Sequence, residues 1–156
     1  MTDTPVLRSL GALDLDRAAA LHCESFVPFG ERGWTRQDMA ELLGSPGVVG
    51  LLLEIDGADV GIAICRVVAD ESELITIAVR PAHRRRGAAR RLLAAVLDHV
   101  RAAGARSLFL EVAADNPAAR TLYELSGFCA AGSRPAYFRR GAGPAADALV
   151  MRLDLG

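Results

Sequence analysis

Residues 74–91 read Leu-Ile-Thr-Ile-Ala-Val-Arg-Pro-Ala-His-Arg-Arg-Arg-Gly-Ala-Ala-Arg-Arg, and two changes of pattern within them indicate the central unit of the chain. The first six residues of this stretch are apolar or β-branched, a pattern that predicts a strand buried on both faces. Pro81 ends the strand, because proline has no N–H to donate to a neighbouring strand. After Gly87, apolar residues recur every fourth position as far as Val100, which predicts an amphipathic helix. The stretch therefore predicts a strand, a basic turn that contains glycine, and a helix.

The turn reads Arg84-Arg85-Arg86-Gly87-Ala88-Ala89, so three arginines precede three residues that carry no bulky side chain. The start of a helix leaves backbone N–H groups unpaired and carries the positive end of the helix dipole. Together with the guanidinium charge, these donors suit a pyrophosphate. The turn matches neither a Walker loop nor a dinucleotide-binding fingerprint. A solvated basic helix start remains the structural alternative.

The 156 residues, with a mass of 16.5 kDa, are expected to form a single domain over 1–156. Hydrophobic residues make up 51% of the chain, yet no run approaches the roughly 18 apolar residues of a membrane span. The first residues lack the features of a signal peptide. The three cysteines, Cys23, Cys65 and Cys129, lie far apart. We therefore expect a reduced cytoplasmic protein without a membrane partner or a cysteine zinc site.

The net charge of −1 does not favour nucleic acid as a partner. The positive charge is concentrated instead, because six arginines lie between positions 80 and 91. Such a cluster favours a small anionic ligand over a polyanion. Aromatic residues amount to 5% and do not interleave with the arginines, so an RNA-binding module is a distant alternative.

Periodicity and turn residues predict further elements on both sides of the central unit. Strands are expected at 6–10, 48–55, 58–68, 107–112, 128–138 and 146–153, and helices at 14–25, from Thr35 to 43 and from Asn116 to 126. A glycine- and alanine-rich loop is expected between the last two strands. Together these elements predict an α/β protein with a mixed sheet of about seven strands and four helices.

Glu111 is the one charged residue in the otherwise apolar segment 108–112. A carboxylate in such a strand must be paired, hydrogen-bonded or placed at an opening. It is either a general base with a perturbed pKa or a structural carboxylate that caps the adjoining loop. The residues alone leave both interpretations open.

Asn116 and Tyr123 lie seven residues apart on the helix that follows, so they share one face of it. Asparagine is an ordinary helix cap, and a tyrosine in mid-helix usually packs against its neighbours. Without further context, structural roles explain both residues.

The segment 110–128 follows the pattern Leu-Glu-Val-x-x-x-Asn-x-x-Ala-x-x-Leu-Tyr-Glu-x-x-Gly-Phe. This pattern resembles the second half of the GNAT acetyltransferases, most closely the ribosomal-protein-alanine N-acetyltransferase (RimI) branch. The spacing Arg84-x-x-Gly87-x-Ala89 resembles the loop with which this family grips acetyl-coenzyme A. Further matches are Ile-Ala-Val at 77–79, the aromatic pair at 137–138 and the segment 147–151. The resemblance runs from about residue 70 to residue 153.

The resemblance implies the GNAT fold, acetyl-coenzyme A as cosubstrate and no metal. Glu111 would accept a proton from the acceptor amine, and Tyr123 would donate one to the leaving thiolate. The residues that would bind acetyl-coenzyme A are Ile77, Ala78, Val79, Arg84, Arg85, Arg86, Gly87, Ala88, Ala89, Arg90 and Asn116.

Two departures from the family pattern concern the loop and the first half of the chain. The second glycine of the family loop is Ala89 here, which is an accepted variant. A Pro-Trp-(Ser/Thr) element appears as Gly33-Trp34-Thr35 after an unfamiliar loop at 26–32. Trp34 either lines the acceptor groove or packs against the helix that follows. His22 stands beside Cys23, but adjacent helix positions point in different directions, which argues against a covalent acetyl-cysteine route.

The expected reaction is direct transfer to an amine in a ternary complex. An α-amino group with a pKa near ~8 is about a tenth neutral at pH 7, so it needs only a mild base such as Glu111 acting through a water. Backbone N–H groups around Ile77 to Val79 would stabilise the oxyanion. We expect the acceptor to be the N-terminal α-amine of a protein, such as a ribosomal protein that begins with alanine, and the enzyme to be a monomer or weak dimer. The alternatives are a small amine (an antibiotic, polyamine or amino acid) and a non-catalytic acyl-coenzyme A-binding regulator.

Overall fold

The structure, a computed structural model, describes residues 4–156. Its seven strands are β1 (Pro5–Ser9), β2 (Val48–Ile55), β3 (Ala58–Val68), β4 (Glu71–Val79), β5 (Ser107–Ala113), β6 (Cys129–Arg140) and β7 (Gly143–Asp154). Its four α-helices are α1 (Leu15–Phe26), α2 (Arg36–Leu43), α3 (Ala88–Ala102) and α4 (Pro117–Leu125). Short 3-10 turns lie at Ala12–Asp14, Val27–Phe29 and Pro81–His83.

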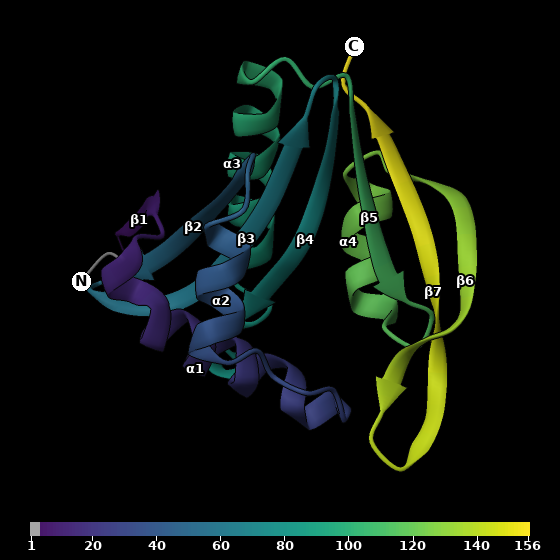
Figure 1. Cartoon of the computed structure of the whole chain (residues 1–156), viewed down its shortest axis with the longest axis horizontal. Helices are drawn as coiled ribbons and strands as arrows, with labels where there is room; N and C mark the ends of the chain where they lie inside the picture. Colours follow the sequence, from purple (N-terminus) through teal and green to yellow (C-terminus); the bar gives the residue numbers. More distant parts are fainter. Residues whose placement is uncertain (1–3) are drawn as a thin grey trace.

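All seven strands form one sheet in the order β1-β2-β3-β4-β5-β7-β6. Neighbouring strands are antiparallel except β4 and β5, which are parallel and are connected through α3. Figure 1 shows that β4 and β5 meet at one end of the molecule and separate toward the other. The predicted mixed α/β sheet of seven strands and four helices is therefore confirmed.

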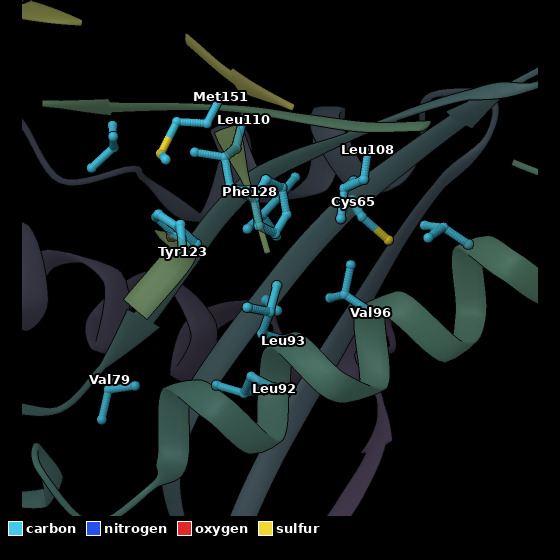
Figure 2. Packing of buried hydrophobic residues seen from close by; sticks show 14 of the residues in the cluster. Cys65, Val79, Leu92, Leu93, Val96, Leu108, Leu110, Tyr123, Phe128 and Met151 are labelled. Carbon is cyan, nitrogen blue, oxygen red and sulfur yellow. The ribbon is translucent and has the colours of Figure 1, made fainter. Parts of the chain in front are cut away.

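Two apolar cores lie on opposite faces of the sheet. The larger core packs α3 and α4 against the strands, and Figure 2 shows Leu92, Leu93 and Val96 of α3 directed at them. The smaller core packs α1 and α2 against β2, β3 and β4. Burying a leucine side chain of this kind stabilises a fold by about 1.5–3 kcal/mol, so α3 anchors its own N-terminus firmly against the sheet.

The start of α1 is anchored to the sheet by a network of charges. Asp14 is buried and accepts hydrogen bonds from the guanidinium groups of Arg8 and Arg17. Arg8 also pairs with Glu54 on β2, at 2.8 Å. The guanidinium of Arg8 and the N–H of Gly11 hold the pKa of Asp14 well below its usual range. This network sets the direction in which α1 crosses the sheet.

Most predicted element boundaries agree with the structure to within two residues, and the bounds predicted for β2 and β3 are those observed. The central strand begins at Glu71, three residues before its predicted start at Leu74. Ser72 is buried there, and its hydroxyl donates a hydrogen bond to the carbonyl of Ser107 on β5. Serine is common in turns, but Ser72 instead links two neighbouring strands of the sheet by a hydrogen bond.

The central strand is buried on both faces over most of its length, since Leu74 and Val79 belong to the larger core and Ala78 to the smaller one. Ile75 and Ile77 are the exceptions, because they are only half-buried and line a cavity.

One prediction of local structure was wrong. The expected loop between the last strands is paired almost to its tip, with Arg140 opposite Gly143. Small residues are typical of a loop, but here they continue the pairing of β6 with β7. β6 itself is kinked by an irregularity in the register between Arg134 and Phe138.

Within the described part of the chain, none of the helices combines the length and apolar character that crossing a membrane requires. The three cysteines are free thiols, and burial raises the pKa of Cys65 to about 11.

Candidate active site

The site lies where β4 and β5 stop pairing. Their ladder begins with Glu71 opposite Ser107 and ends with Leu74 opposite Leu110. Beyond that point 75–79 and 111–113 diverge, as the separation of the two strands in Figure 1 shows. Backbone groups that would otherwise pair with a neighbouring strand are left facing the opening.

A cavity of about 280 Å³ occupies this opening. Its walls include the diverging ends of both strands, and the residues that line it from other elements are His22, Phe26, Glu31, Arg32, Trp34, Asn116, Ala119, Tyr123 and Phe138. A second cavity of about 180 Å³ shares four of the lining residues and extends to Arg84 at the basic turn. The two cavities connect the turn with the acceptor end of the site, which we define as the part lined by 22–34 and Phe138.

Backbone groups of Ile77 and Val79 point into the opening. The N–H of Arg80 donates to the carbonyl of Val60 on β3, at 2.9 Å. Hydrogen-bonded pairs alternate along an antiparallel ladder, so the register assigns the backbone groups of Ala78 to β3 as well. Those of Ile77 and Val79 then point to the other side, toward β5. There the Val79 carbonyl accepts a hydrogen bond from the hydroxyl of Ser25 on α1 at 3.1 Å, so Val79 offers only its N–H to the opening. Ala78 differs from its two predicted companions, because its side chain is buried in the smaller core.

The basic turn combines exposed charge with an unusual backbone. Gly87 caps α3 with φ +80°, and Arg85 also has a positive φ of 63°. The first hydrogen bond of the helix runs from Arg91 N–H to the Gly87 carbonyl, at 3.0 Å. The N–H groups of residues 88–90 therefore precede the intrahelical ladder and point out of the helix start. This arrangement fits a bound pyrophosphate.

The side chains of the turn divide into two groups. Arg85, Arg86 and Arg90 are exposed, whereas Ala88 is buried in the larger core and can offer only its N–H. Arg84 reaches back to α1, where its guanidinium donates to the Ser25 carbonyl at 3.1 Å. Arg84 therefore ties the turn to α1 and lines the second cavity at the same time.

Asn116 lines both cavities from the start of α4. Its side-chain oxygen accepts the N–H of Ala119 at 3.2 Å, which is the predicted capping role. The cap uses the carbonyl oxygen of the amide, and the NH₂ group stays available to a ligand. One residue thus fits both the structural and the binding interpretation.

Tyr123 is 8% exposed and contacts the ring of Phe128 edge-on, with the ring centroids 5.7 Å apart. It also lines the larger cavity. Burial raises the pKa of Tyr123 to about 12, so the phenol keeps its proton throughout the physiological range. A buried tyrosine at a cavity wall is therefore equipped to donate a proton or hydrogen bond and not to accept a proton.

Glu111 lines the same cavity, from the first position of β5 that no longer pairs with β4. Its carboxylate forms an ion pair with the Nε of Arg134 on β6, at 2.7 Å. A hydrogen bond with this carboxylate raises the pKa of Tyr137, which lies in the bulged part of β6. Glu111 is thus held by the last hairpin and does not cap the loop after its own strand.

The acceptor end is largely aromatic. His22 is buried, and its ring is stacked on Trp34 with centroids 4.3 Å apart and tilted against Phe26 at 4.6 Å. Cys23 and His22 both bond the backbone of Trp34: the thiol donates to its carbonyl, and the imidazole accepts its N–H. They do not form a Cys-His pair. Trp34 both lines the cavity and packs, so neither of its two interpretations excludes the other.

Arg140 ties three segments together around this end. It contacts Glu31 on the α1–α2 loop at 3.0 Å and Asp115 on the β5–α4 loop at 2.8 Å. Burial raises the pKa of Glu31, and the nearby Arg140 partly offsets that effect. The hairpin that carries Arg140 therefore forms one wall of the acceptor end.

The sequence profile of the acetyltransferase (GNAT) family matches residues 15–128, well over half of the chain. This chain belongs to the GNAT family. It is 35% identical to the N-alpha-acetyltransferase RimI of Mycobacterium tuberculosis, over 99% of this chain and 96% of that protein. It is 41% identical to the [ribosomal protein bS18]-alanine N-acetyltransferase of Salmonella typhimurium, over 67% of this chain and 70% of that protein.

A solved structure shows the same likeness in three dimensions. The crystal structure of the ribosomal-protein-S18-alanine N-acetyltransferase from Escherichia coli superposes with a TM-score of 0.89 at 32% identity. The match covers 98% of this chain and 95% of that one. The chain is accordingly an N-acetyltransferase that uses acetyl-coenzyme A, and the resemblance read from the motifs is confirmed.

Several residues of this GNAT site were not singled out in the sequence. Arg134 and Arg140 come near the site only because the last hairpin folds back beside β5, and Glu31 reaches it from the α1–α2 loop. Nothing in their local spacing marks them, since each partner lies more than twenty residues away. Among the described residues, no three His, Cys, Asp or Glu side chains come together in a way that could hold a metal ion.

Proposed function

We propose that this acetyltransferase modifies the N-terminal α-amine of a protein, and that its acceptor is a ribosomal protein that begins with alanine. One observation carries the proposal: Glu111 and Tyr123 line a single cavity at the point where β4 and β5 separate. The names of the relatives support the choice of acceptor, because they describe acetylation of an alanine or an α-amine.

Acetyl-coenzyme A supplies the acetyl group as a thioester. The N–H groups at the start of α3 and the side chains of Arg85, Arg86 and Arg90 would hold its pyrophosphate. The second cavity, lined by Ala118 and Ala119, offers an apolar path from the turn to the opening. The N–H groups of Ile77 and Val79 would donate to the acetyl oxygen, where negative charge develops during attack.

Glu111 acts as the proton acceptor for the amine, through a water. An α-amine near pKa ~8 is already about a tenth neutral at pH 7, so the carboxylate needs to supply little basicity. Its ion pair with the Nε of Arg134, at 2.7 Å, fixes the direction of the carboxylate. A lysine ε-amine, near pKa ~10.4, would demand a stronger base.

Tyr123 acts on the leaving sulfur. Its hydroxyl donates a hydrogen bond to the thiolate and delivers a proton there. The same burial that raises the pKa of Tyr123 also penalises a bare thiolate, so a hydrogen bond from the hydroxyl stabilises the departing sulfur.

The proposal extends to the setting of the enzyme. We infer that 1–156 act as a single GNAT domain, and that the enzyme works in the cytoplasm, where ribosomal proteins are made. One comparison tests the function: acetyl-coenzyme A consumption with a panel of peptides that differ in the first residue, run against small amines and free amino acids. Peptides with a free N-terminal alanine should give the highest kcat/KM. A higher value for a polyamine, an antibiotic or a free amino acid would overturn the proposed acceptor.

A further inference from the structure

His22 presents a hydrogen-bond donor to the acceptor end of the cavity. It lies on α1, is 4% exposed, and is one of the residues that line the larger cavity. A buried polar ring is costly unless its nitrogen atoms are satisfied, so each nitrogen must be accounted for.

One nitrogen of the ring has a fixed partner. The backbone N–H of Trp34 donates to His22 Nδ1 at 3.2 Å. Because Nδ1 accepts, the neutral ring carries its proton on Nε2. Burial lowers the pKa of His22 to about 4, although the charge of Asp38 works in the opposite direction. The imidazole is therefore neutral and has a defined tautomer.

The other nitrogen is a donor that is left for a ligand. Among the residues that the structure describes, Trp34 provides the only hydrogen bond to this ring. In the same set, the one buried side-chain nitrogen or oxygen atom without a hydrogen bond belongs to Arg140. Nε2 of His22 therefore has no hydrogen-bond partner among these residues, yet it is not fully buried. Because His22 lines the cavity, we assign the exposed part of Nε2 to the cavity wall.

The ring is held rigidly in this orientation. It stacks on Trp34 within 13° of parallel. The loop that carries Trp34 packs tightly on α1, where a Cβ atom at Gly33 would come within 2.7 Å of the Cys23 Cα. Only glycine permits that approach, and the approach brings the Trp34 N–H to the imidazole.

The arginines near this end of the cavity already form ion pairs with carboxylates. The N–H of His22 differs from them because it is neutral and has no such partner. Arg134 pairs with Glu111, Arg140 pairs with Glu31 and Asp115, and Arg32 pairs with Asp38. A neutral N–H beside aromatic rings suits a neutral carbonyl oxygen. A carboxylate or phosphate would instead be served by an unpaired arginine.

We propose that His22 Nε2–H donates a hydrogen bond to the carbonyl oxygen of the acceptor's first residue and so positions the α-amine beside Glu111. This inference rests on the proposed function. It makes His22 a specificity-determining residue for α-amino acyl groups, in which the amine is one carbon from a carbonyl. A lysine ε-amine and a simple alkylamine have no carbonyl at that distance, and a free amino acid presents a carboxylate there.

The test compares two acceptors with three enzymes. The acceptors are a peptide with a free N-terminal alanine and its isostere in which an (E)-alkene replaces the first peptide bond. The enzymes are wild type, His22→Phe, which keeps a stacked ring without a donor, and His22→Gln, which restores a donor near Nε2. Because every enzyme meets both acceptors, the different basicity of the isostere cancels in the comparison.

We expect wild type to prefer the peptide over the isostere, and His22→Phe to reduce that preference about 5- to 10-fold, which is the scale of one neutral hydrogen bond. His22→Gln should recover part of the preference. The KM for acetyl-coenzyme A should stay constant, and calorimetry on the enzyme–coenzyme A complex should show weaker peptide binding in His22→Phe.

The possible failures can be told apart. Equal losses on both acceptors in His22→Phe, or a preference that neither variant changes, would overturn the role of His22 while peptide acetylation stands. If His22→Phe does not fold, the comparison between wild type and His22→Gln decides the question on the same criterion. Absence of transfer to any peptide, together with turnover of small amines, would overturn the proposed function and this inference with it.

Discussion

The site has two ends: one at the basic turn before α3, and the acceptor end. At the first, the groups aimed at a ligand belong mostly to the backbone, whereas at the acceptor end they belong to side chains. The first set comprises the peptide groups of Ile77, the N–H of Val79 and the N–H groups of 88–90. The second set includes His22 and Glu111, each fixed by a partner from another segment. The direction of a backbone group is set by the path of the chain. The end near α3 therefore requires only small residues and the correct turn.

This difference explains what each end does for the enzyme. A cosubstrate that is the same in every turnover is well served by backbone donors, which few substitutions disturb. An acceptor must be distinguished from other amines, and that task needs side chains of particular shape and charge. Substitutions at the two ends should therefore affect different steps of the reaction.

Tyr123→Phe should give the largest loss. The substitution keeps the ring packed against Phe128 and removes only the hydroxyl, so kcat should fall about 10²- to 10³-fold, the usual scale for general acid catalysis. Steady-state kinetics with both substrates measures this. Thermal stability and acetyl-coenzyme A affinity serve as controls and should change little. A kcat within twofold of wild type would return Tyr123 to a packing role.

Gly87→Glu should weaken acetyl-coenzyme A binding about 10²-fold, because a like charge placed against the pyrophosphate costs several kcal/mol. Gly87→Gln is the matched control. Both side chains suffer the same strain at φ +80°, so the difference between them reports the charge. Calorimetry with coenzyme A measures both affinities. Equal affinities in the two variants would contradict the placement of the pyrophosphate.

The sequence predicted the α3 end well and the acceptor end poorly, for a physical reason. Residues 74–91 contain the strand, the turn and the helix start in one continuous run, so local spacing alone reveals the site. The acceptor end assembles His22, Glu31, Arg134 and Arg140 from segments more than 100 residues apart. Their partners are set by the order of strands in the sheet, which spacing does not encode.

Individual residues show the same limit. Glu111 stood out because it interrupts an apolar strand, but its pairing with Arg134 could not be read from either residue. Helix geometry argues against a pair of His22 with Cys23, but it does not reveal the contact of His22 with the Trp34 backbone, which forms only when the loop folds onto α1. The half-burial of Ile77 escaped prediction because composition cannot show where two strands part.

His22 makes a prediction about stability and pH. A histidine whose pKa falls from 6.5 to about 4 on folding contributes stability that is complete above pH 6.5 and is lost as the pH falls toward 4. Between pH 7 and pH 5 the loss from this residue should be about 2 kcal/mol in the free energy of unfolding. Urea unfolding of wild type and His22→Gln measures it, since only wild type carries this titration. Parallel losses in both proteins would show that His22 is not buried in its neutral form.

Glu111→Gln should have the smallest effect on catalysis. Because an α-amine is about a tenth neutral at pH 7, loss of a base should lower kcat/KM about 10-fold there. The deficit should shrink above pH ~8, where the amine deprotonates without help. A pH–rate profile of both enzymes measures this, and Arg134→Met, which keeps the carboxylate, is the control for the ion pair. A deficit that does not vary with pH would indicate that Glu111 positions the peptide and does not remove its proton.

The central claim is that the acceptor is an α-amine next to a peptide carbonyl, and one peptide tests it. A peptide with a free N-terminal alanine and one internal lysine offers both kinds of amine to the same enzyme in the same tube. After reaction with acetyl-coenzyme A, tandem mass spectrometry locates the acetyl group. The account predicts acetylation of the alanine amine, and no product from the same peptide blocked at its N-terminus. Acetylation of the lysine side chain, or of neither amine while small amines are consumed, would contradict it.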